Sequence, residues 1–262
     1  MTRLWRLGGA LLLATAAGCS GTTGGSLVTL PFSAGGADVP STFTTPEGWS
    51  VTLQTALISL GPFYFTISPP SQELATSGVV IVQATEQVVV NALDPTLQEV
   101  PGRADGETGT AVAAVIRLLP PDATQSAAVQ AQLGSNVGLV SGTATKGTTT
   151  VPFSGPIVIN PNLADAAVPL STLEQVSGAY AGLTFLATPQ TLALRVDPTH
   201  WFDAVDFSLL LQGTPSSGVY TWDVSDCSGE TAAEMYQCVF LDTLLEGVQA
   251  QSGVYQFQLS SP

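Results

Sequence analysis

Short runs of alternating large and polar residues recur along this chain and predict strands. Residues 49–55 alternate in this way and continue into a more apolar run at 56–60; Gly61-Pro62 interrupts the pattern before it resumes at 63–67. An alternation with a period of two places one face of a strand in a core and the other in water. The same reasoning predicts further strands at 78–84, 87–92, 111–119, 139–145, 148–153, 157–159, 183–187, 192–196, 219–224 and 254–259, with a hairpin turn at Lys146-Gly147.

Two segments carry helical signals instead. Thr231 and Glu234 have the spacing of a capping box, which predicts a helix that ends near Gly247. Asp197-Pro198 has the form of an N-cap followed by proline and predicts a second helical segment, with Phe202, Val205 and Leu209 on one face. Taken together, the pattern predicts an all-β protein, an antiparallel β-sandwich with one or two short helices.

The first nineteen residues follow a different order. Arg3 and Arg6 precede an apolar run at 7–17, and the small residues Ala16-Ala17-Gly18 stand directly before Cys19. This order resembles the lipobox signal of bacterial lipoproteins, although Ala16 stands where leucine is commoner. An ordinary signal peptide with a coincidental cysteine is the alternative, whereas the apolar run is too short for a transmembrane anchor.

The resemblance implies that Cys19 becomes an acylated N-terminus. Serine at position 20, directly after the cysteine and in place of aspartate, resembles the pattern of lipoproteins that are sent to the outer membrane. The resemblance therefore implies anchoring in the outer membrane, either on its periplasmic face or at the cell surface. The expected organisation is a signal peptide at 1–18, a lipidated cysteine and flexible tether at 19–26, and a β-sandwich domain at 27–262, with a division into two subdomains left open. A tether this short and rich in glycine reaches only ~15 Å.

Composition narrows the expected partners. Without residues 1–18 the chain keeps four basic residues against twenty acidic ones. Such a surface repels phosphates, so we expect no nucleic acid and no electrostatic adhesion to anionic lipid. The partners expected are the membrane, through the lipid anchor, and an unidentified envelope protein or small ligand.

The remaining cysteines, Cys227 and Cys238, form a pair that an oxidising compartment would join. We therefore predict a disulfide between them. Their spacing, with a single histidine elsewhere in the chain, is a poor match to a zinc site.

That single histidine, His200, lies in the densest mixture of aromatic and ionisable residues. On one helical face His200, Asp203 and Asp206 could hold a metal ion, or they could line the exposed side of a short helix. Asp105-Gly106-Glu107 and residues 160–165 offer oxygen ligands for calcium, but we expect both to be solvated loops. No cofactor is expected, with a divalent metal left open.

No serine-nucleophile elbow or phosphate-binding loop occurs in the sequence. The stretch 46–65 is similar to stretches of uncharacterised all-β envelope lipoproteins, which supplies no activity. We therefore expect a noncatalytic binding or assembly module of the cell envelope. The alternatives are a metal-binding accessory lipoprotein that uses His200 and the nearby aspartates, and a cell-envelope hydrolase.

Overall fold

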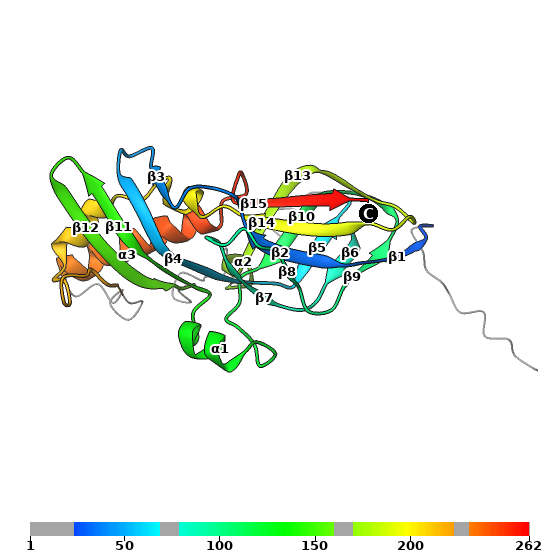
Figure 1. Cartoon of the computed structure of the whole chain (residues 1–262), viewed down its shortest axis with the longest axis horizontal. Helices are drawn as coiled ribbons and strands as arrows, with labels where there is room; N and C mark the ends of the chain where they lie inside the picture. Colours follow the sequence, from blue (N-terminus) through cyan, green and yellow to red (C-terminus); the bar gives the residue numbers. More distant parts are fainter. Residues whose placement is uncertain (1–23, 69–78, 160–169, 223–230, 262) are drawn as a thin grey trace, which may run out of the picture.

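The computed structural model describes residues 24–68, 79–159, 170–222 and 231–261 and shows an all-β, sandwich-like fold. In Figure 1 two face-to-face sheets lie at the right, and a third sheet, covered by helices, extends to the left. The predicted fold class is confirmed.

The sandwich consists of a six-stranded and a four-stranded sheet. The larger sheet has the order β1-β9-β6-β5-β10-β13, and the smaller has the order β15-β14-β2-β8. Ring contacts join the two layers: Phe32 lies edge-on to Phe63 at 4.9 Å, and Phe65 lies edge-on to Phe257 at 5.0 Å. The strands of the larger sheet are β1 (Leu27–Leu30), β5 (Phe63–Thr66), β6 (Val80–Ala84), β9 (Ala104–Glu107), β10 (Gly109–Arg117) and β13 (Gln175–Phe185). Those of the smaller sheet are β2 (Phe32–Gly36), β8 (Gln98–Glu99), β14 (Thr191–Val196) and β15 (Tyr255–Ser260).

The third sheet has the order β12-β11-β4-β3, and β7 pairs with the far end of β4. Its strands are β3 (Thr42–Thr44), β4 (Ser50–Leu60), β7 (Val88–Asn91), β11 (Gly138–Lys146) and β12 (Thr149–Ile157). One face is covered by α3 (Ala232–Val248) and by two 3-10 helices, η2 (Pro198–Phe202) and η3 (Phe207–Gln212). Rings from both layers meet there, as Phe207 contacts Phe153 at 5.0 Å and Phe240 at 5.6 Å.

Most of the buried hydrophobic residues of both parts form one connected cluster. Most strand pairs are antiparallel, as expected, but β2 and β14 run parallel. Gly36 in β2 is required there, because a Cβ would lie 2.3 Å from the carbonyl oxygen of Ala92.

The helix predicted from the capping box is confirmed. The Thr231 side chain accepts from the Glu234 backbone at 3.2 Å, and the Glu234 carboxylate accepts from the Thr231 backbone at 2.7 Å. Two further helices, α1 (Ala127–Leu133) and α2 (Leu170–Leu173), were not predicted. Of the helices in the described ranges, none is long and apolar enough to cross a membrane.

Several strand predictions need correction. The strand expected at 157–159 is only the end of β12, and the one expected at 183–187 is the end of β13. Residues 223 and 224 of the strand expected at 219–224 lie outside the described residues, and Val219 and Tyr220 form isolated bridges instead of a strand. The Tyr220 amide donates to the Pro152 carbonyl, and the Trp222 indole donates to the Pro156 carbonyl. The Ser154 amide of β12 also donates to the Tyr220 carbonyl at 3.0 Å. Pro152 and Pro156 on the same edge lack amides, so the described residues form isolated bridges there rather than a ladder.

The tripeptide Asp-Pro-Thr occurs twice, at residues 94–96 and 197–199, and forms a local turn at both places. In each, the aspartate accepts from the backbone amide two residues later, at 2.9 Å for Asp94 and Asp197. Asp122 and Asp206 make the same contact with a following threonine or serine. The hydrogen bonds within each tripeptide explain the recurrence as a turn device.

Candidate functional site

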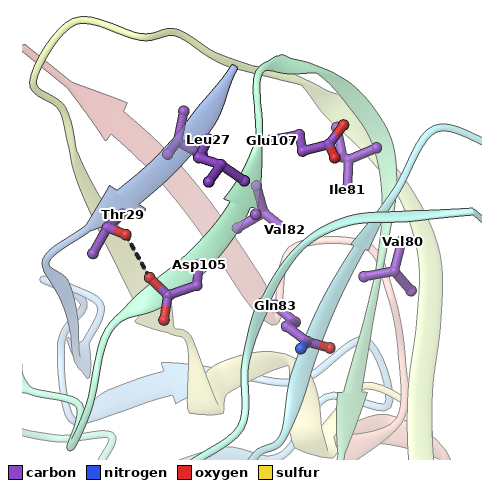
Figure 2. Close-up of a pocket in the computed structure, with 10 residues that line it drawn as sticks. Leu27, Thr29, Val80, Ile81, Val82, Gln83, Asp105 and Glu107 are labelled. Atoms are coloured by element: carbon purple, nitrogen blue, oxygen red, sulfur yellow. Dashed lines mark hydrogen bonds between the residues drawn. The ribbon is translucent and has the colours of Figure 1, made fainter. Parts of the chain in front are cut away.

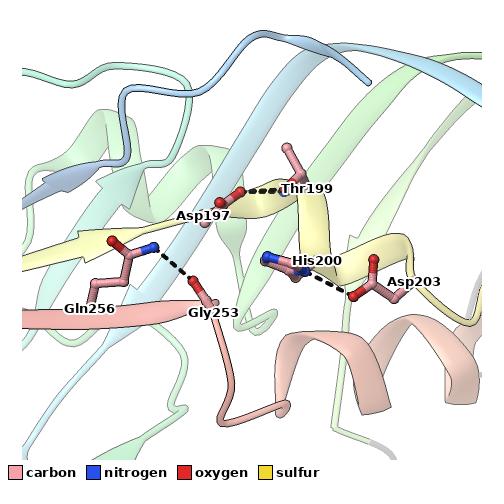
Figure 3. Close-up of polar contacts among 6 residues, drawn as sticks. All are labelled: Asp197, Thr199, His200, Asp203, Gly253 and Gln256. Carbon is pink, nitrogen blue, oxygen red and sulfur yellow. Dashed lines mark hydrogen bonds and ion pairs between the residues drawn. The ribbon is translucent and has the colours of Figure 1, made fainter. Parts of the chain in front are cut away.

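His200 and Asp203 form an exposed pair on one side of η2. The imidazole Nδ1 lies 2.9 Å from the Asp203 carboxylate, and the two side chains are 40% and 50% exposed (Figure 3). The other edge of the ring lies against Gly253, where a Cβ would come within 2.7 Å of Nε2. Gly253 has φ +87°, so glycine is favoured there both by this backbone conformation and by the close approach of the His200 ring.

Asp206 belongs to a different structural unit. It is the N-cap of η3 and accepts from the Ser208 amide at 2.9 Å and from the Ser208 hydroxyl at 2.7 Å. It also accepts from the indole Nε1 of Trp49 at 3.2 Å. Burial alone would raise the pKa of Asp206, but the Ser208 and Trp49 hydrogen bonds and the charge of Lys146 outweigh it and hold the pKa below its ordinary value.

The expected single helical face across this segment is therefore wrong. The chain breaks into η2 and η3 because Asp197 and Asp206 each begin a separate helix as its N-cap. His200 and Asp203 are brought together, but the Asp206 carboxylate is engaged by Trp49 and Ser208. Within the ranges that the structure describes, no three His, Cys, Asp or Glu side chains gather around one metal position.

Of the three cysteines, only Cys238 lies within the described residues. Cys238 lies in α3 and is disulfide-bonded. Cys19 and Cys227 lie outside the described residues, so the lipidation site and the pairing of Cys227 with Cys238 stay predictions. Residues 160–165, the second of the loops considered for calcium, also lie outside the described residues. The strand before them, β12, ends at Ile157.

An open pocket of about 610 Å³ lies over β1, β6 and β9 (Figure 2). Its polar side chains stand in register across three strands, because Asp105 is the cross-strand partner of both Thr29 and Gln83. Cross-strand partners share one face of a sheet, so these groups converge. The Thr29 hydroxyl donates to the Asp105 carboxylate at 2.6 Å and orients it.

Apolar side chains and a second carboxylate complete the pocket. Leu27 pairs in register with Glu107, and both line it together with Val80 and Ile81. Gly106 lets β6 and β9 approach closely, since a Cβ there would lie 1.9 Å from the Ile81 carbonyl oxygen. The pocket therefore combines an aliphatic wall with two acidic groups.

The sequence did not indicate this site. Asp105-Gly106-Glu107 was expected to be a solvated loop, but it forms most of β9. Glycine and acidic residues are poor strand formers, so the pairing with β1 and β6 determines their conformation. The short apolar run Leu27–Leu30, with the β-branched residues Val28 and Thr29, is a local signal in favour of a neighbouring strand, although its residues do not alternate between apolar and polar.

Comparison with known proteins gives no family assignment. No family model matches the chain, and no curated protein matches it. A solved structure, MbnP from Methylosinus trichosporium, aligns with a TM-score of 0.25 and 10% identity over 70% of this chain and 79% of that one. A likeness at this level carries no argument about function.

Proposed function

We propose that this chain is a membrane-anchored extracytoplasmic lipoprotein whose folded domain is a noncatalytic binding module of the cell envelope. The anchor is the acylated Cys19, and the membrane is the outer membrane. The observation that supports the binding role is the pocket over β1, β6 and β9.

The pocket has the properties of a small-ligand site. Its volume of about 610 Å³ is typical of such sites, which combine apolar walls with a few converging polar groups. Here Leu27, Val80 and Ile81 supply the apolar wall, while Asp105 and Glu107 supply negative charge. These groups fit a ligand that carries an ammonium group on a short aliphatic chain.

The ligand site can be tested on the chain from Ser20 onward, which keeps every described residue. In amide NMR spectra, n-hexylammonium should shift the signals of Thr29, Gln83 and Asp105, whereas hexanoate should not. Asp105→Asn should weaken the hexylammonium effect several-fold. Asp38→Asn, at an exposed position outside the pocket, makes the same charge change as a matched control.

The outcomes separate pocket binding from a general charge effect. Equal weakening in Asp105→Asn and Asp38→Asn would show that overall acidity attracts the probe. Absence of shifts at all three pocket residues would contradict the proposed ligand site. The anchor is tested separately in a bacterial host, where Cys19→Ala should abolish incorporation of labelled palmitate.

A metal-binding accessory role keeps one supporting observation, the exposed His200–Asp203 pair. Two side chains leave most of a coordination sphere to other donors. Calcium, zinc and copper are added singly to the wild type and to His200→Ala. A rise in melting temperature with one of these ions that is lost in His200→Ala would support this role, and no rise with any of them would contradict it.

A further inference from the structure

Exposed aliphatic side chains gather at one end of the sandwich. Leu27 is 86% exposed, and Ile67, Val79, Val80 and Leu186 are each between 42% and 51% exposed. We call these five residues the apolar rim. Single exposed aliphatics are common on proteins, but a group of them at one end marks an interaction surface.

Strand register places the rim residues at the same end. Leu27 pairs with Glu107, the last residue of β9, and β10 begins two residues later at Gly109, which pairs with Phe185 directly before Leu186. β6 runs antiparallel to β9 and so begins at this end, with Val80. The Ile67 amide donates to the Val79 carbonyl at 3.1 Å, which places these two rim residues side by side, directly before Val80.

The described chain enters β1 at this same end (Figure 1). The Ser26 amide donates to the Thr108 hydroxyl at 3.0 Å, and the Thr108 amide donates to the Ser26 carbonyl at 2.8 Å. These bonds hold the chain against the sheet immediately before Leu27. Seven residues, three of them glycine, separate this point from Cys19, and the reach expected from such a composition is ~15 Å.

We propose that the apolar rim inserts into the surface of the bilayer that holds the acyl chains of Cys19. This inference rests on the lipid anchor of the proposed function. The short tether keeps the rim at high effective concentration beside the membrane, so even a weak contact is occupied. Aliphatic side chains gain from leaving water at the interface, as they do on interfacial helices.

The negative charge beside the rim indicates which lipid headgroups it can contact. Glu107 is the cross-strand neighbour of Leu27, and Asp105 lies one row further along β9. Both would be repelled by anionic lipid, so the rim fits a surface of zwitterionic headgroups. In this orientation the pocket, which shares Leu27 and Val80 with the rim, opens beside the membrane.

The orientation can be tested with a fluorescent reporter in the full lipoprotein. Leu27→Trp places an indole in the rim, and Met235→Trp places one in α3, at a position outside the rim that is 54% exposed, against 86% for Leu27. The native Trp49, Trp201 and Trp222 of the folded domain are buried and give little quenching of their own. Each variant is reconstituted in vesicles of phosphatidylcholine, with and without bromine on the acyl chains.

Brominated lipid should quench the Leu27→Trp signal at least twofold more than the Met235→Trp signal. Equal quenching in the two variants, with the protein floating with the vesicles, would overturn the rim contact and leave the anchor standing. A blue-shifted but unquenched Leu27→Trp signal would show that protein, such as a second copy of the chain, covers the rim, and would also overturn it. Failure of the wild type to float with vesicles would overturn the anchor itself.

Discussion

Replacing Asp206 with alanine should destabilise the domain far more than replacing Asp203, although both aspartates follow His200 closely in the sequence. The Asp206 carboxylate caps η3 and accepts the indole N–H of Trp49, which is only 2% exposed. Loss of an N-cap costs about 1 kcal/mol. Leaving a buried donor unpaired costs a further ~1–3 kcal/mol. We therefore expect Asp206→Ala to lower the free energy of unfolding by roughly 2–4 kcal/mol.

Asp203→Ala is the matched control. Asp203 is half exposed and pairs with His200 at the surface, an interaction of about 0.2–1 kcal/mol when both groups are charged. Urea unfolding followed by tryptophan fluorescence measures both variants. With an m value near 3 kcal/mol/M, Asp206→Ala should lower the unfolding midpoint by about 1 M, and Asp203→Ala by about 0.3 M or less.

A double-mutant cycle separates the cap from the indole contact. Trp49→Phe removes the indole N–H while keeping a ring in the aromatic cluster with Phe207. Asp206→Ala should therefore cost less in the Trp49→Phe background, by about 0.5–3 kcal/mol. If Asp206→Ala and Asp203→Ala lower stability equally, or if the cycle shows no coupling, the structural role assigned to Asp206 is wrong.

Three further outcomes follow from the same contacts. Because the pKa of Asp206 is held below its ordinary value, the ionised carboxylate stabilises the fold above the ordinary aspartate pKa, and this stabilisation is lost as pH falls through the folded-state pKa. Asp206→Asn keeps the cap oxygen and should flatten this part of the acid unfolding curve. Burial, and then the charge of Glu246, raise the pKa of Asp242, so its ionised form is less favourable in the folded state than in the unfolded state. Asp242→Asn should therefore raise the melting temperature at pH 7. The gain should vanish once pH is below the ordinary aspartate pKa, where both states hold the proton. Gly247→Ala should lower the melting temperature despite a better helix propensity, because the new Cβ would lie 2.2 Å from the Trp201 carbonyl oxygen; calorimetry showing equal or higher stability would contradict this packing.

Local devices were predictable from the sequence because their groups are close together along the chain. The capping box of Thr231 and Glu234 forms as expected. The hairpin after β11 also forms, with its turn at residues 147–148, one residue later than predicted. Strands dense in valine and isoleucine, such as β6 and β7, were found near their predicted positions.

Two strands without such residues, β2 and β9, were not predicted. β2 ends in two glycines, and β9 is built mainly from glycine and acidic residues. Neither has a strong preference for extended backbone, so their conformation depends on partners that lie far away in the sequence. For β2 that partner is β14, more than 150 residues later, in the parallel pair.

The sequence by itself determined the class of the fold, the acidic surface and the local turns and caps, because each depends on composition or on residues within a few positions of one another. Only the tertiary structure decided how the site residues are used. It assigns Asp206 to Trp49, 157 positions away, rather than to His200. It also joins Leu27 with Glu107 in one pocket. Contacts across such distances arise from strand register and core packing, which no local pattern of residues specifies.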